Sequence, residues 1–188
     1  MRALACLLVA TALFCSPLQA QEQAAAAGGF ASGGFGGVVT KLSEMVGEPA
    51  IFVGARGGWV LNHAFVLGGG AYALANTVDA PGLVEPISKF IYGGIEVEYI
   101  ALASAPVHFS VMTLVGAGRR FRTDEPDPDH DEVFILEPAA NVQVNVASFF
   151  RIDAGGGYRY VSRVTSGDIE NDDLRAFFGA LTLRFGTF

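Results

Sequence analysis

The chain has 188 residues, of which 51% are hydrophobic and only 16% are charged, and its formal net charge at pH 7 is −7. An acidic chain lacks the basic surface that neutralises phosphates, so we expect no nucleic-acid partner. Charges this sparse are also unusual for a surface that contacts water.

The first 20 residues have the pattern of a cleavable secretory signal peptide. Arg2 is followed by the apolar run ALACLLVATALFC and then by SPLQA, whose small residues favour cleavage after Ala20. Both cysteines, Cys6 and Cys15, lie inside this segment. We therefore expect an exported mature chain without a disulfide or a thiolate ligand.

Residues 21–29 are rich in alanine and glycine, and we expect them to form a flexible lead-in. Residues 30–188 alternate between apolar and polar side chains, which is typical of strands. This alternation predicts strands at about 34–45, 49–60, 64–77, 88–102, 106–121, 132–146, 149–164 and 174–188. No mature segment has the roughly 18 unbroken apolar residues of a spanning helix, so a membrane location would require strands.

The connections between these strands differ in length. Those at 61–63, 103–105 and 147–148 are very short, whereas those at 78–87, 122–131 and 165–173 are long and acidic. Apart from the short first turn in VGEP, short and long connections alternate, and in an up-and-down barrel alternate connections emerge at opposite ends. Short periplasmic turns and long outer loops are the plan of an outer-membrane barrel. The predicted fold class is all-β: an eight-stranded antiparallel up-and-down transmembrane β-barrel with a filled polar lumen.

The stretch IYGGIEVEYIAL, residues 91–102, illustrates the two faces of these strands. Glu96 and Glu98 lie two residues apart and share one face, while Ile95, Val97 and Tyr99 share the other. Across all strands, the polar face carries four arginines and four acids, a balance that suits a crowded interior where an unpaired charge is costly. This predicts a lumen charge network of Arg56, Glu96, Glu98, Glu137, Arg151, Asp153, Arg159 and Arg184.

Aromatic side chains of the apolar face recur near the short-turn ends of the strands, where they would form an interfacial girdle. They are Trp59, Phe65, Tyr99, Phe109, Phe150 and Phe185. The last residue, Phe188, is one position out of phase with Leu181, Leu183 and Phe185. Either Gly186 kinks the last strand, or the match to an outer-membrane C-terminal strand is imperfect.

The signal peptide, eight amphipathic strands, alternating loop lengths and terminal Phe188 together resemble the small eight-stranded outer-membrane β-barrels of the OmpA, OmpX and OmpW type. The resemblance implies contact with outer-membrane lipid and lipopolysaccharide, and recognition of the C-terminal strand by the barrel-assembly machinery. It implies no cofactor and no catalytic activity. The expected role is structural, envelope-stabilising or surface interaction through acidic outer loops, with the surface partner left open.

Two other functions compete with this interpretation. A soluble periplasmic barrel of the lipocalin kind would bind a small apolar ligand inside. A hydrolase resembling the barrel lipid A deacylases would use His108 and Ser110, which share a face, to make a serine nucleophile. However, Val111 and Met112 follow Ser110 where that family has Asn-Ala, and His108 lies near a short turn, so we expect a lumen hydrogen bond rather than catalysis.

The loop DEPDPDHDE, residues 124–132, places Asp127, Asp129 and Asp131 at alternate positions. An EF-hand is excluded because Glu132 and Pro138 stand where that loop needs glycine and glutamate. We expect either a solvated acidic loop or a weak surface cation site, and no other metal site.

Overall fold

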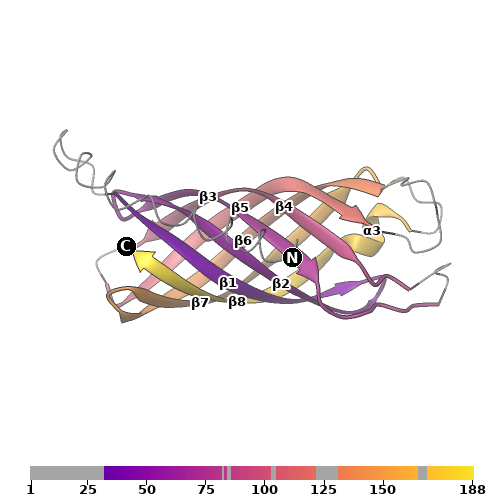
Figure 1. The fold of residues 1–188 in the computed structure, drawn as a ribbon, viewed down its shortest axis with the longest axis horizontal. Coiled ribbons are helices and arrows are strands. Elements are labelled where there is room, and N and C mark those ends of the chain that lie inside the picture. The colour runs from indigo at the N-terminus through magenta and orange to yellow at the C-terminus, as the bar shows by residue number, and fades with distance from the viewer. Residues whose placement is uncertain (1–31, 82, 84–85, 103–104, 122–130, 165–168) are drawn as a thin grey trace, which may run out of the picture. The chain divides into compact units, whose positions relative to one another are not determined.

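The computed structural model describes residues 32–188, except residues 82, 84–85, 103–104, 122–130 and 165–168. The predicted signal peptide and lead-in lie outside this part of the chain. The structure contains eight long strands, which pair antiparallel in sequence order, and β8 returns to pair with β1 so that the barrel closes (Figure 1). The predicted fold class is confirmed. The strands are β1 (Ser32–Met45), β2 (Glu48–Leu61), β3 (Phe65–Leu74), β4 (Phe90–Ala101), β5 (Val107–Arg120), β6 (Asp131–Ala147), β7 (Phe150–Ser162) and β8 (Ala176–Thr187).

Two of the short connections, β1–β2 and β2–β3, are tight turns with left-handed backbone. The β1–β2 turn has φ of 54° at Val46 and 76° at Gly47, and the β2–β3 turn has φ of 51° at Asn62 and 56° at His63. Positive φ at both central residues is the hairpin geometry that follows the right-handed twist of strands. The C-terminal end of β8 lies at the end of the barrel opposite the helix α3 (Asn171–Leu174) of the last long loop (Figure 1).

Two strand boundaries differ from the prediction. β3 ends at Leu74 rather than near residue 77, since the Asn76 side chain continues the pairing with β2. Its Oδ1 accepts from the Ile51 amide at 2.7 Å and its Nδ2 donates to the Pro49 carbonyl at 2.9 Å. Before β8, residues 171–174 form α3, whereas the sequence pattern predicted a loop up to 173 and a strand from 174; Leu174 anchors this turn by burying its side chain. No helix within the described residues is long and apolar enough to cross a bilayer.

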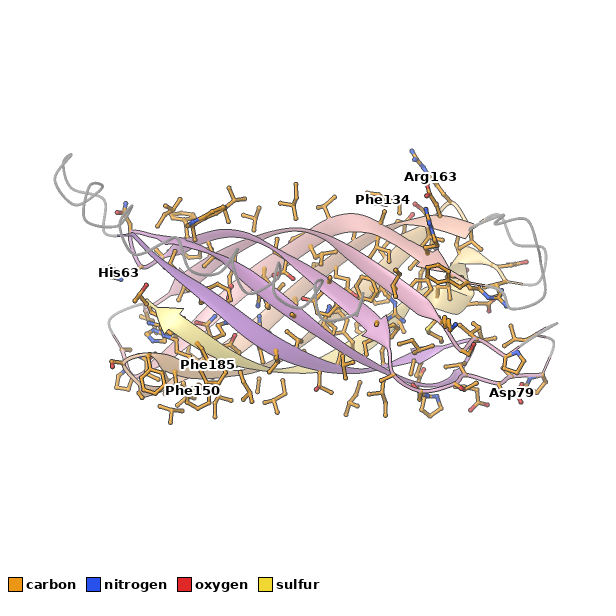
Figure 2. All side chains as sticks on the ribbon, in the orientation of Figure 1. His63, Asp79, Phe134, Phe150, Arg163 and Phe185 are labelled. Atoms are coloured by element: carbon orange, nitrogen blue, oxygen red, sulfur yellow. The ribbon has the colours of Figure 1, made fainter. Side chains whose placement is uncertain are left out.

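The apolar face of the strands points outward. The apolar residues predicted to face outward are exposed or half-buried, with Trp59 69% and Ile95 64% exposed. Figure 2 shows Phe150 and Phe185 close to the end marked by His63, while Asp79 and Arg163 mark the opposite end. At the short-turn end Phe65 packs on Tyr99 and Phe150 on Phe185, with ring centroids 5.1 and 4.9 Å apart.

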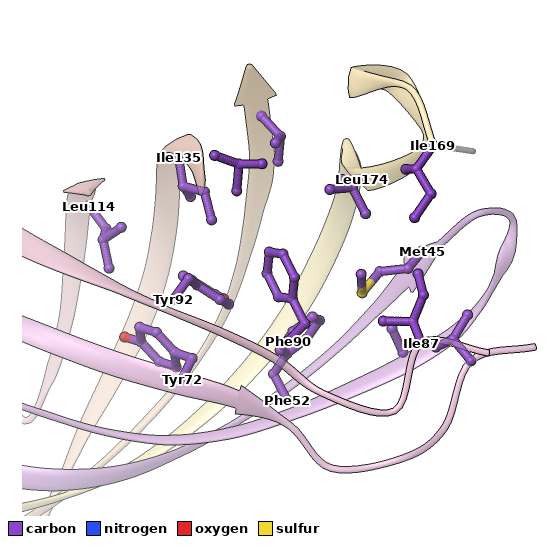
Figure 3. Close-up of a cluster of buried hydrophobic side chains, with 14 of the residues drawn as sticks. Met45, Phe52, Tyr72, Ile87, Phe90, Tyr92, Leu114, Ile135, Ile169 and Leu174 are labelled. Atoms are coloured by element: carbon purple, nitrogen blue, oxygen red, sulfur yellow. The ribbon is translucent and has the colours of Figure 1, made fainter. Parts of the chain in front are cut away.

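The lumen has three layers rather than one polar filling. Toward the loops lies a buried apolar cluster to which strands, loops and α3 all contribute (Figure 3). It contains Met45, Phe52, Tyr72, Val78, Ile87, Phe90, Tyr92, Leu114, Ile135, Ile169 and Leu174, among others. Toward the short turns a smaller cluster contains Phe35, Val60, Val66 and Ile100, with Phe188 packed against it. Most of the buried charges lie between these clusters, whereas Arg159 reaches the loop end beside Leu174 and Arg151 lies at Phe188 near the short turns.

Candidate functional site

A chain of ion pairs crosses the middle of the lumen. Arg56 on β2 contacts two acids of β4: its Nε lies 2.7 Å from Glu96 Oε2 and its Nη2 lies 3.1 Å from Glu98 Oε2. Arg184 on β8 continues the chain, with its Nη2 2.9 Å from Glu98 Oε1 and its Nε in contact with Asp153 on β7. All five side chains are buried. The order is Glu96, Arg56, Glu98, Arg184 and Asp153, so acid and base alternate.

At the Glu96 end of the row of ion pairs, a tyrosine donates a hydrogen bond to the carboxylate. Tyr72 on β3 donates its hydroxyl to Glu96 Oε1 at 2.6 Å. Gly70 makes room for this contact, because a Cβ at Gly70 would lie 2.5 Å from Glu96 Oε1 and 2.8 Å from the Tyr72 hydroxyl. A hydrogen bond from a neutral donor to a buried carboxylate is one of the stronger kinds in proteins.

Replacing Tyr72 with phenylalanine is expected to lower the free energy of unfolding by about 1 to 3 kcal/mol, since Glu96 Oε1 loses a donor in a buried site. Urea unfolding of protein refolded into lipid vesicles measures the change. Tyr99→Phe is the matched control, because Tyr99 points outward and is 46% exposed. Equal stabilities of the two variants would show that the Tyr72 hydroxyl contributes nothing at Glu96.

A second charge cluster contains a residue that the sequence analysis left out. Lys41 on β1 contacts Glu137 on β6, and the Tyr92 hydroxyl donates to Glu137 Oε1 at 2.9 Å. The Lys41 ammonium also lies 3.5 Å from the centre of the Tyr72 ring, a cation–π contact that links the two clusters. Two features of the sequence could have identified Lys41 as an interior residue. It lies in the largely apolar stretch VVTKL, and the chain has only two lysines.

The two remaining arginines of the predicted network have other contacts than those of Arg56 and Arg184. Arg159 donates to two carbonyls, that of Leu174 at 2.9 Å and that of Glu44 at 2.8 Å. Arg151 stacks on the ring of Phe188 at 3.9 Å. Arg159 therefore binds backbone at the loop end, while Arg151 lies at Phe188 and acts on Asp153 and Glu98 only electrostatically.

Phe188 lies on the lumen side of β8. The strand runs through Gly186 in unbroken register with β1, and Phe188 stacks on Phe35 with centroids 6.3 Å apart. Residues 184, 186 and 188 share the inward face of a strand, so the phase difference from Phe185 follows from ordinary alternation and requires no kink.

His108 and Ser110 are both buried but have separate partners. His108 Nδ1 lies 2.9 Å from the Leu102 carbonyl oxygen, while Ser110 Oγ accepts from Gln143 Nε2 at 2.9 Å. A serine nucleophile requires a hydrogen bond to its base. Here the hydrogen-bonding nitrogen of His108 is directed to the backbone at the short turn.

The predicted surface cation loop lies almost entirely outside the described residues. Asp127 and Asp129 belong to residues 122–130, and Asp131 is the first residue of β6, where its backbone pairs with Arg120. Where the structure describes the chain, no three or more His, Cys, Asp and Glu side chains are grouped as a metal site.

Comparisons with known proteins agree on the fold. The structure of neisserial surface protein A (NspA) has a TM-score of 0.63 at 16% identity, with 84% of this chain and 99% of that chain covered. The N-terminal barrel of Pseudomonas aeruginosa OprF gives 0.56 at 10% identity, covering 81% and 96%. Yersinia pestis Ail with the heparin analogue sucrose octasulfate gives 0.50 at 16% identity, covering 82% and 97%. All three are small eight-stranded outer-membrane barrels. No protein-family model and no curated protein matches the chain.

Proposed function

We propose that this chain is an exported, non-enzymatic β-barrel of the bacterial outer membrane, with a structural, envelope-stabilising or surface-interaction role. The observation that carries the proposal is the inverted distribution of side chains. Large apolar residues surround the outside, while ion-paired charges fill the middle of the inside. This arrangement is favourable only in a hydrocarbon surrounding. In water the apolar band would be exposed to solvent, and the buried charges would not offset that cost.

The same distribution argues against the two competing functions. A lipocalin-like carrier needs an apolar interior with room for a ligand, whereas buried charges and two apolar clusters occupy this lumen. A lipid hydrolase needs an activated nucleophile near lipid, whereas Ser110 faces the lumen and accepts from Gln143.

Surface interaction would use the loop end of the barrel. Exposed acids at that end include Glu44, Asp79 and Glu170, while Glu132 and Asp172 are exposed but pair with Arg119 and Arg175. A partner of cationic chemistry would fit the acids that remain unpaired. Outer-membrane lipid and lipopolysaccharide would surround the apolar band, and the barrel-assembly machinery would receive the C-terminal strand.

Cell fractionation tests the proposal directly. We expect the protein in the outer-membrane fraction, with gel mobility that changes on heating, and cleavage of the 122–131 loop by a protease added to intact cells. Recovery of freely soluble protein from a periplasmic extract would contradict the proposal.

Purified protein in a planar bilayer is expected to give no steady conductance above that of the bare bilayer. The reason is that the lumen of an eight-stranded barrel is just wide enough to be filled by side chains. Current recordings at several voltages provide the measurement. A reproducible open level would contradict a structural role and favour a pore.

A further inference from the structure

The central chain of ion pairs ends on a carboxylate at both sides. It has three carboxylates, Glu96, Glu98 and Asp153, and two guanidiniums, Arg56 and Arg184. The Glu96 end is stabilised by the Tyr72 hydroxyl. At the other end Asp153 Oδ1 is buried and has no hydrogen-bond partner. Arg184 contacts Asp153 and Arg151 acts on it electrostatically, so what the Asp153 end lacks is a hydrogen-bond partner for one buried carboxylate oxygen.

Two further unpartnered acceptors lie beside Asp153. His108 on β5 pairs across the strands with Gln143 on β6, and Gln143 pairs with Asp153 on β7. The three side chains are 0%, 0% and 2% exposed, all on the inward face. The unpartnered acceptors are His108 Nε2, Gln143 Oε1 and Asp153 Oδ1, and the neighbouring Arg184 has one unpartnered donor, Nη1. Three adjacent strands thus present one free acceptor each, and cross-strand neighbours on one face are within contact distance.

The second polar atom of each side chain is held by another group. His108 Nδ1 lies 2.9 Å from the Leu102 carbonyl and so must carry the proton, which leaves a lone pair on Nε2. Gln143 Nε2 donates to Glu98 Oε1 at 2.6 Å, which assigns the free position to its oxygen. Asp153 Oδ2 contacts Arg184. Ligands of bound metals are typically oriented in this way, above all a histidine whose other nitrogen donates to a backbone carbonyl.

We propose that His108, Gln143 and Asp153 form a lumen site for one divalent transition-metal cation of the zinc class. One imidazole nitrogen and two oxygens suit such an ion, whereas calcium requires six to eight oxygen ligands. The third ligand is an amide, which distinguishes the site from a cluster of His, Cys, Asp and Glu side chains. The site goes beyond the proposed envelope role and does not depend on it.

The apolar clusters on either side of the charges imply that the ion enters while the barrel closes. The experiment therefore supplies metal during refolding. The starting protein carries His63→Gln and His130→Gln, so that His108 is its only imidazole. It is refolded with zinc chloride, freed of loose metal by gel filtration, and analysed for zinc per chain by mass spectrometry. We expect about one zinc ion per folded chain and no retained calcium in a parallel preparation.

Two isosteric or near-isosteric variants then test the ligands. His108→Gln and Asp153→Asn in the same background are each expected to lower the retained zinc about tenfold or more. Heat-dependent gel mobility shows that each variant has folded. Undiminished zinc in either folded variant, or no zinc in the starting protein, overturns the site.

A third measurement needs no change at the site itself. The starting protein refolded with copper(II) is expected to show the nitrogen modulation of one imidazole in pulsed electron paramagnetic resonance. A spectrum without that modulation overturns the proposal even if both variants fail to fold. Loss of the metal site would leave outer-membrane fractionation unchanged, so its failure is distinct from failure of the proposed function.

Discussion

Replacing Glu98 with alanine is expected to lower the free energy of unfolding by about 3 to 5 kcal/mol, the range for removing one partner of a buried ion pair. Glu98 is the middle acid of the chain and lies between Arg56 and Arg184 at 3.1 and 2.9 Å. It also accepts from Gln143 at 2.6 Å. Its loss would leave three buried donors without their acceptor, which is why we expect a larger effect than from Tyr72→Phe.

Urea unfolding in lipid vesicles, followed by the fluorescence of the single tryptophan, Trp59, measures this change. Glu132→Ala is the matched control. Glu132 also pairs with an arginine, Arg119, at 2.6 Å, but its side chain is 71% exposed. Exposed pairs contribute about 0 to 1 kcal/mol. If Glu98→Ala proves no more destabilising than Glu132→Ala, the central charges are solvated and the lumen is open to water.

Replacing Ile95 with arginine is expected to destabilise the barrel in a bilayer by about 2 to 4 kcal/mol, the range for a cation on the lipid face at mid-depth. Ile95 lies in the middle of β4, points outward and is 64% exposed. The same vesicle assay measures the effect, and the amount of protein recovered in the outer-membrane fraction is expected to fall with it.

Leu102→Arg is the matched control for Ile95→Arg. Leu102 is equally exposed, at 64%, but it follows the end of β4 at a short turn, where the expected cost is about 0 to 1 kcal/mol. If both substitutions have the same small effect, no hydrocarbon surrounds the middle of the barrel. A soluble, fully folded Ile95→Arg protein would lead to the same conclusion.

Some interior contacts were predictable because they depend on alternation within one strand. Glu96 and Glu98 had to share a face, and the apolar residues between them had to share the other. Their partners were not predictable to the same degree. Four arginines were candidates, and the structure brings Arg56 and Arg184 to these acids while Arg151 and Arg159 bind elsewhere.

The reason is that a partner inside a barrel depends on the stagger of distant strands. Lys41 and Glu137 are 96 residues apart in the chain, and only the combined register of the intervening strands brings β1 and β6 to the same level across the lumen. The alternation of side chains within one strand does not show at which level along the barrel axis a residue lies relative to distant strands. The apolar clusters at the two ends were not predicted for the same reason. Alternation predicts that a side chain points inward, but not where it lies along the barrel axis.

By itself, then, the amino-acid sequence determined the strand number, the two faces, the alternation of short and long connections, and most of the charged residues of the interior, with Lys41 as the exception. These follow from local chain geometry and from the separation of apolar and polar side chains. The tertiary structure alone decided which charges meet, that Phe188 turns into the lumen, and that His108, Gln143 and Asp153 lie in one row. Those are matters of register between strands, which is settled only when the barrel closes.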